Sequence, residues 1–241
     1  IGSLHLWFDP MSRRRPLAAL IWINGRFART RDIGWELPVD PPASERPLSE
    51  DSTERAPTLC VACEARHRGI CGALDPEQLL ELSRSAHRLV AEEGSEIVGD
   101  AERVDHYANI LSGVVKLTKS LSDGRQQVVG LRFPPDFLGR PYRKESTINA
   151  EAATTVSLCT FPRTTIERLL REQPDLERRL FVQALEELDE ARDWLVTLGR
   201  KTAAEKIASF LLLIARNIDP DAQVEMRQAV FDLPLFRADI A

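Results

Sequence analysis

Four cysteines are the residues of this 241-residue chain whose type and spacing best suit chemistry. Cys60, Cys63 and Cys71 lie close together in the segment TLCVACEARHRGICGAL, and Cys159 lies alone far downstream. Cysteine thiolates are soft metal ligands, and in a reducing compartment such a cluster binds metal more often than it forms disulfides. We therefore expect residues 58–74 to form a metal-binding loop whose fourth ligand arrives only when the chain folds.

The segment TTVSLCTF around the fourth cysteine has the alternation of a β-strand. Successive side chains of a strand point to opposite faces, so Val156 and Leu158 share one face, while Ser157 and Cys159 share the other. With Val156 and Leu158 in a protein core, Cys159 points outward, where it can meet the upstream cysteine loop.

Short apolar segments with turn residues between them run from residue 88 to residue 161, and they predict an antiparallel barrel or jelly roll. Just before them, Asp75 suits a helix N-cap and Pro76 suits the first helical position. Just after them, the segment TTIERLLRE at 164–172 predicts a short helix. These elements would position the cysteine loop and Cys159.

A long helix follows, because no Pro or Gly interrupts the chain between Asp175 and Gly199. Its apolar residues repeat with alternating spacings of three and four, as in a heptad seam, over roughly 37 Å at about 1.5 Å per residue. This exceeds what one barrel needs, so we favour dimerisation over a helix buried within one chain. Thr202 and Glu205 then form a capping box for another helix. The predicted dimerisation residues are Phe181, Ala184, Leu188, Ala191, Leu195 and Leu198.

Composition narrows the function further. The hydrophobic content of 43%, the charged content of 29% and the net charge of −5 are ordinary for a soluble globular protein. We expect a cytoplasmic location. No apolar run approaches the roughly 18–20 residues of a membrane span. A barrel enzyme with a metal bound by clustered histidines is disfavoured, since only His106 of four histidines falls near a strand. We expect no enzyme, no catalytic residues and no membrane partner.

The order of barrel, long helix and helical end resembles the cyclic-AMP receptor protein and fumarate–nitrate reduction regulator superfamily of bacterial transcription factors. The segments that carry the resemblance are NILSGVVKL, PPDFLG, KTAAEKIASFLL and LPLFRADIA. It implies an α+β fold, in which an antiparallel β-roll like that of cyclic-nucleotide-binding domains precedes a dimerisation helix and the start of a winged helix-turn-helix domain. The expected parts are an irregular, disordered segment at 1–57, the cysteine loop at 58–74, the β-roll at 75–172, the helix at 174–199 and the DNA-binding domain at 201–241.

The cysteine spacing resembles the oxygen-sensing branch of that superfamily, where four matching cysteines bind a [4Fe–4S] cluster. The resemblance implies that Cys60, Cys63, Cys71 and Cys159 hold this cluster, that the intact cluster favours the homodimer, and that oxygen releases DNA. An intact member would also have RNA polymerase as a partner. The alternative is a zinc site in a module for effector binding or dimerisation, although the seven-residue spacing and the lone fourth cysteine fit zinc less well.

Two departures from the family pattern matter. Where the cyclic-nucleotide-binding branch holds a phosphate with Arg, this chain has Glu151, so we expect no cyclic nucleotide to bind. The resemblance also implies that the recognition helix lies beyond Ala241, and Phe236 cannot act as the Ser or Thr cap that precedes it. The sequence therefore predicts an incomplete DNA-binding domain, and it assigns no DNA-binding residues.

Overall fold

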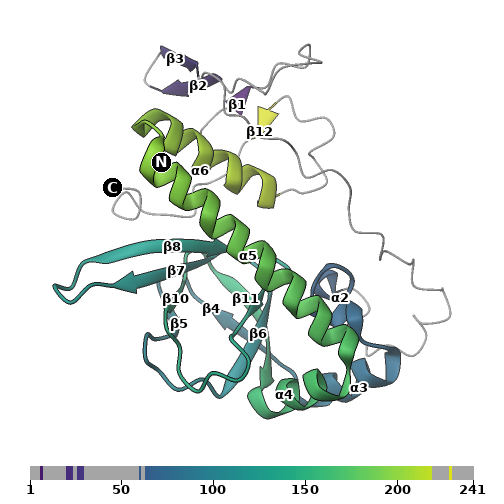
Figure 1. Ribbon diagram of the computed structural model, residues 1–241. Helices are drawn as coiled ribbons and strands as arrows, with labels where there is room; N and C mark the ends of the chain where they lie inside the picture. Colours follow the sequence, from purple (N-terminus) through teal and green to yellow (C-terminus); the bar gives the residue numbers. More distant parts are fainter. Residues whose placement is uncertain are drawn as a thin grey trace. The chain divides into compact units, whose positions relative to one another are not determined.

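The computed structural model divides the chain into two compact units (Figure 1). One unit comprises residues 47–191 and 234–241, and the other comprises residues 1–46 and 192–233. The residues that the structure describes are 6–7, 20–23, 26–29, 60, 63–218 and 228–229.

The first of these units contains the barrel and the helices around it. Before the barrel lie α2 (Glu64–Arg68), η2 (Ile70–Ala73) and α3 (Pro76–Ser85). The strands are β4 (His87–Ala91), β5 (Glu96–Val98), β6 (His106–Ser112), β7 (Val115–Ser120), β8 (Gln126–Arg132), β9 (Phe137–Leu138), β10 (Asn149–Ala152) and β11 (Val156–Pro162). After them come α4 (Arg163–Glu172) and α5 (Pro174–Arg200), and α5 continues into the other unit.

Two antiparallel sheets make the barrel, in the orders β5-β10-β7-β8 and β4-β11-β6-β9 (Figure 1). Alternate residues of β6 and β11 face inward, where Ile110, Val156 and Leu158 form one apolar core with residues of β7 and β10. The opposite faces of the same strands carry Tyr107 and Phe161, which pack in a second core with η2, α3 and α4. The period-two pattern of the sequence therefore sets both cores.

The helix before the barrel begins as the sequence predicts. The Asp75 carboxylate accepts a hydrogen bond from the backbone N–H of Gln78 at 2.9 Å, and the Gln78 side chain accepts from the N–H of Asp75 at 3.0 Å. This capping box satisfies two donors that a helix start otherwise leaves without a partner. Leu79 and Leu82 are then buried against the second core, so α3 is fixed at one end of the barrel.

Glu167 on α4 joins that helix to the barrel. Its Oε1 accepts hydrogen bonds from the Tyr107 hydroxyl at 2.9 Å, the backbone N–H of Tyr142 at 2.9 Å and Nε of Arg163 at 2.7 Å. Tyr107 is almost fully buried, so its hydroxyl needs such a partner. The contact with Tyr142 also holds a residue whose φ of 68° is uncommon outside glycine.

The other unit holds α6 (Ala203–Ile218) and a small antiparallel sheet in the order β12-β1-β2-β3. The Thr202 and Glu205 capping box is present, with the Glu205 carboxylate accepting from the backbone N–H of Thr202 at 2.8 Å. The short strands are β1 (Leu6–Trp7), β2 (Leu20–Ile23), β3 (Arg26–Arg29) and β12 (Gln228–Ala229).

These strands correct the prediction of irregular chain for part of residues 1–57. The run Leu20–Ile23, LIWI, is rich in β-branched and aromatic residues, which favour a strand, and β2 pairs with β1 and β3. The remainder of 1–57 lies outside the described residues, as does Phe236. Among the described helices, none combines the length and apolar character needed to cross a bilayer.

Candidate functional site

All four cysteines line one cavity, although 99 positions separate the first from the last. Cys71 is buried, and Cys60, Cys63 and Cys159 are partly buried; all four thiols are free. The cavity lies beside the second core, against which Cys60 and Cys159 pack. The structure thus brings together the four cysteines that the sequence singles out.

Tight backbone turns shape the upstream part of this site. The carbonyl of Cys60 accepts from the N–H of Cys63 at 3.3 Å, and the carbonyl of Cys63 accepts from the N–H of Arg66 at 3.0 Å. A Cβ at Gly72 would lie 2.8 Å from the backbone oxygen of Arg66. Only glycine lets η2 pass this close to α2, and that approach turns Cys71 into the protein.

Strand β11 supplies the fourth thiol. Cys159 lies between Arg88 of β4 and Asn109 of β6 in the register of the sheet. Its neighbours Val156 and Leu158 are fully buried in the barrel core, whereas Cys159 is on the other face and lines the cavity. The predicted alternation along this strand is therefore confirmed.

Burial and mutual repulsion act on the thiols. Burial, followed by the charges of the other cysteines, raises the pKa of Cys71 to about 12. The same causes raise the pKa of Cys159 to about 11, and they also raise that of Cys60. Cysteines that are protonated in the free protein must lose protons when they bind metal.

Two arginine side chains offset part of this repulsion between thiolates. Arg66 and Arg88 line the cavity, and both lower the pKa of Cys60, while Arg88 also lowers that of Cys159. Guanidinium groups beside several thiolates would offset part of the negative charge of a bound anionic group. Within the described ranges, no three His, Cys, Asp or Glu side chains are grouped closely enough to hold a single metal ion.

The cysteine loop contacts the long helix α5 directly. Nη2 of Arg179 on α5 donates a hydrogen bond to the backbone oxygen of Arg68, the last residue of α2, at 2.5 Å. Leu176 of α5 is fully buried in the same core as Ile70 and Cys71. A displacement of the loop would therefore act on the first turns of α5.

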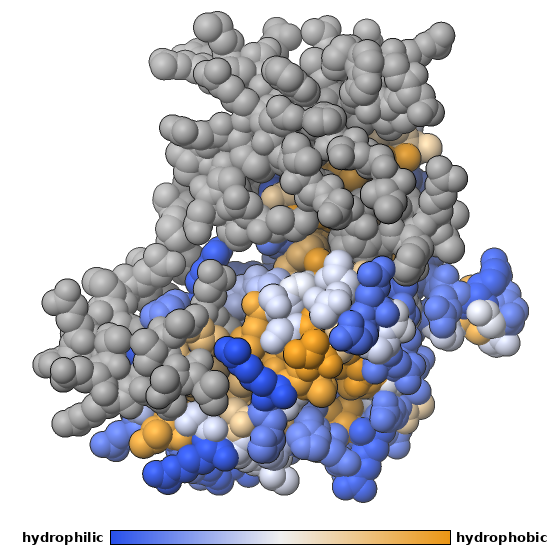
Figure 2. Space-filling model, turned by 180° about the vertical axis from the view of Figure 1, so that it is seen from behind, coloured by the Kyte–Doolittle hydropathy of each residue, from blue (hydrophilic) through white to orange (hydrophobic). Residues whose placement is uncertain are grey.

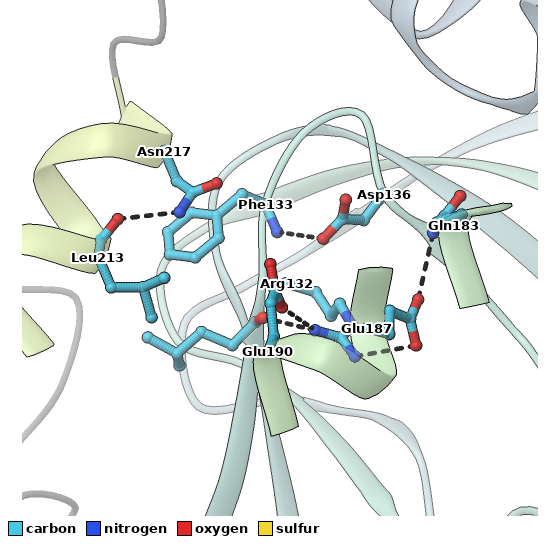
Figure 3. A network of polar contacts seen from close by, with 9 residues as sticks. Arg132, Phe133, Asp136, Gln183, Glu187, Glu190, Leu213 and Asn217 are labelled. Carbon is cyan, nitrogen blue, oxygen red and sulfur yellow. Dashed lines mark hydrogen bonds and ion pairs between the residues drawn. The ribbon is translucent and has the colours of Figure 1, made fainter. Parts of the chain in front are cut away.

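A second connection between barrel and α5 is an ion-pair network that the sequence reasoning missed (Figure 3). Arg132 at the end of β8 reaches Glu187 at 2.9 Å and Glu190 at 3.3 Å, and its side chain is only 12% exposed. Glu187 also accepts a hydrogen bond from Gln183 at 3.2 Å. Two acidic residues one turn apart on a helix do not indicate which residue of a distant strand they will pair with. This ion pair therefore could not be predicted from the sequence.

The predicted seam of α5 is exposed in the single chain. The exposed large residues include Phe181, Leu188, Leu195 and Leu198, and Ala184 and Ala191 are exposed as well. A row of apolar side chains along a helix that is not covered by its own chain is typical of an interaction surface.

Other surface features are less organised. Leu89 and Val90 on the edge strand β4 are exposed. Figure 2 shows an apolar area bordered by hydrophilic residues on one face of the molecule. Glu151, which the family resemblance sets against a phosphate-binding Arg, pairs with Lys116 at 3.2 Å. A carboxylate paired in this way offers no positive site for a phosphate.

The barrel followed by a long helix and a further helix has the fold of the cyclic-nucleotide-binding type. The family model described as the cyclic nucleotide-binding domain matches residues 88–173. A probable transcriptional activator of Rhizobium leguminosarum is 51% identical over 185 residues, which cover 77% of this chain and 76% of that protein. The transcriptional activator protein FnrL of Cereibacter sphaeroides is 38% identical over 186 residues, which cover 76% and 74% respectively.

Among solved structures, FixK2 from Bradyrhizobium japonicum matches with a TM-score of 0.56 and 30% identity, covering 64% of this chain and 75% of that one. The chain belongs to the cyclic-AMP receptor protein and fumarate–nitrate reduction regulator superfamily of bacterial transcription regulators. The predicted α+β fold with its antiparallel jelly roll is confirmed, and the matching relatives are transcription regulators rather than enzymes.

Proposed function

We propose that this protein is an oxygen- or redox-responsive transcription regulator, in which a [4Fe–4S] cluster held by Cys60, Cys63, Cys71 and Cys159 controls dimerisation and DNA binding in the cytoplasm. The observation that carries the proposal is the convergence of all four cysteines on one cavity. The relatedness to transcriptional activators such as FnrL supports the regulatory part.

The donor set fits an iron–sulfur cluster. Such clusters are held by four cysteine thiolates, which these residues supply, and Arg66 and Arg88 provide nearby positive charge. A single zinc ion would draw four sulfurs to within about 2.3 Å of one point. The preference for a multi-iron group over zinc rests on the sequence, in which seven residues separate Cys63 from Cys71 and Cys159 stands alone. When bound, the cluster would supply a reactive centre whose loss reports oxygen.

This chain's own residues suggest how the signal reaches the dimer seam. The loop that carries Cys71 is joined to α5 through the contact of Arg179 with Arg68 and through the buried Leu176. The seam on α5 would pair with a second copy of the chain. We therefore infer that the cysteine loop stabilises the orientation of α5 in which two copies associate.

The first test is an anaerobic absorption spectrum with iron and sulfide assays, repeated after brief exposure to air. We expect about four irons per chain and a visible band that changes in air. Cys159→Ala should abolish both. Ser157→Ala, on the same face of β11 two residues away, is the matched control and should leave them unchanged. A colourless wild-type protein without iron would refute the cluster, and one equivalent of zinc would establish the zinc-stabilised module instead.

The second test concerns the seam. Leu195 is 71% exposed on the seam, and the adjacent Val196 is 57% exposed but points away from it. Leu195→Glu should shift anaerobic protein from dimer to monomer in sedimentation experiments, whereas Val196→Glu should sediment like the wild type. Equal behaviour of the two variants would exclude this seam as the dimer interface.

A further inference from the structure

A buried asparagine lies between two of the four cysteines. Asn109 on β6 donates a hydrogen bond from Nδ2 to Sγ of Cys71 at 3.2 Å, and in the register of the sheet it stands directly opposite Cys159. Asn109 is 1% exposed and lines the same cavity as the cysteines. One amide thus touches a ligand from the loop and flanks the ligand from the barrel.

The other end of this amide has no partner. Oδ1 of Asn109 is buried and forms no hydrogen bond with the described part of the chain. A buried acceptor left in this state costs about 1–3 kcal/mol, so an apolar side chain of similar shape would suit the strand better. Because the asparagine costs stability at this position, its presence needs a reason other than packing. The hydrogen bond to the Cys71 sulfur is such a reason.

We infer that Asn109 is a positioning residue for the cluster of the proposed function, on which this inference rests: its amide orients the Cys71 sulfur and stabilises negative charge on it. A neutral N–H donor favours the more negative state of a sulfur ligand without adding a charge of its own. Outer groups that hydrogen-bond metal ligands fix their orientation and tune both affinity and potential. Asn109 acts through Cys71 and therefore affects properties of the bound cluster rather than the set of ligands.

The structure contains a matched control. Asn149 on β10 is also a buried asparagine, at 9% exposed, and it donates a hydrogen bond to Oγ1 of Thr118 at 3.4 Å. Its Oδ1 likewise has no partner among the described residues. It does not line the cysteine cavity. Leucine at either position removes the amide and keeps the branching of the side chain, so any general effect on the barrel appears in both variants.

The experiment compares anaerobically reconstituted wild type, Asn109→Leu and Asn149→Leu by two readouts, iron loss to a chelator and the reduction potential of the cluster. We expect Asn109→Leu to hold iron about 10–100-fold more weakly. Its potential should become more negative, by about 59 mV for each tenfold change in a one-electron equilibrium. Asn149→Leu should match the wild type in both.

A second substitution tests the donor if the leucine variant does not fold. Asn109→Asp keeps the shape of the side chain but places an acceptor beside the sulfur, so it should shift both readouts in the same direction. If Asn109→Leu and Asn109→Asp both behave like Asn149→Leu while the wild type binds iron, the inference is wrong and the proposed function stands. If the wild type binds no iron, both the inference about Asn109 and the proposed function are wrong.

Discussion

Replacing Gly72 by alanine tests whether the cysteine loop is held as closely as the structure indicates. The new Cβ would lie 2.8 Å from the carbonyl oxygen of Arg66 and 3.1 Å from that of His67, whereas ordinary contact begins at 3.4 Å. Both neighbours are backbone atoms, so η2 must move away from α2 by about 0.6 Å. Overpacking of this kind costs about 1–3 kcal/mol, and ligand constellations tolerate displacements of only about 0.5 Å.

We therefore expect Gly72→Ala to lower the free energy of unfolding by about 1–3 kcal/mol and to reduce the iron content of reconstituted protein. Anaerobic urea unfolding and an iron assay measure the two effects. Gly199→Ala is the control, because nothing lies within 4 Å of its Cβ and alanine favours the helix. A Gly72→Ala protein with the stability and iron content of the wild type would refute the close packing of α2 against η2.

Three further predictions concern the barrel, the thiols and α4. Leu158→Ala, in a fully buried core position, should cost about 2–5 kcal/mol in urea unfolding. In metal-free protein at pH 8, Cys71 should be alkylated more slowly than Cys159, because burial raises the pKa of Cys71 to about 12 and that of Cys159 to about 11. Mass spectrometry of timed samples measures the order of alkylation, and the reverse order would contradict this prediction. Burial raises the pKa of Glu167, but its hydrogen bonds, first that from Arg163, outweigh burial and lower the pKa overall. The ionised Glu167 therefore stabilises the fold above the usual carboxyl pKa, and this stabilisation is lost as the pH falls through the lowered pKa. Glu167→Gln should therefore be less stable than the wild type at pH 7, and the difference should shrink near pH 3; a constant difference in thermal unfolding would oppose this.

The sequence predicts those parts of the fold that depend on local rules. The alternation of Val156, Leu158 and Cys159 places one thiol outside the barrel core, and the structure confirms it because strand periodicity is a property of the backbone. The predicted N-cap at Asp75 and the predicted capping box at Thr202 are likewise local and are present. The convergence of the four cysteines was expected from the type of residue, the outward face of Cys159 and the family resemblance, because no local rule brings Cys159 to the loop.

Features that depend on tertiary packing were not predictable. The short strands β9 and β10 have only two and four residues and lack a clear alternation, so they exist only through their pairing with β6 and β7. Asn109 looks like an ordinary polar residue in the segment HYANILSG, and its contact with Cys71 appears only when β6 is packed against η2. The partners of Arg132 on α5 were hidden for the same reason.

The proposed control of the α5 seam by a bound cluster depends on where the cysteine site lies. The thiols do not lie inside the barrel; they lie on its outer face, in the cavity formed with the cysteine loop and α3. That loop touches the first turns of α5 through Arg179, and Leu176 shares the second core with the loop, with α4 and with the barrel. The Arg132 network fixes the middle of the same helix to β8 independently of the cysteines. Loss of the loop's order would remove one support of the first turns of α5, which also pack against α4, while the Arg132 network still holds the middle of the helix. Such a change would tilt the helix rather than detach it. A change of angle along a seam of residues spaced by three and four misaligns every successive contact with a partner helix.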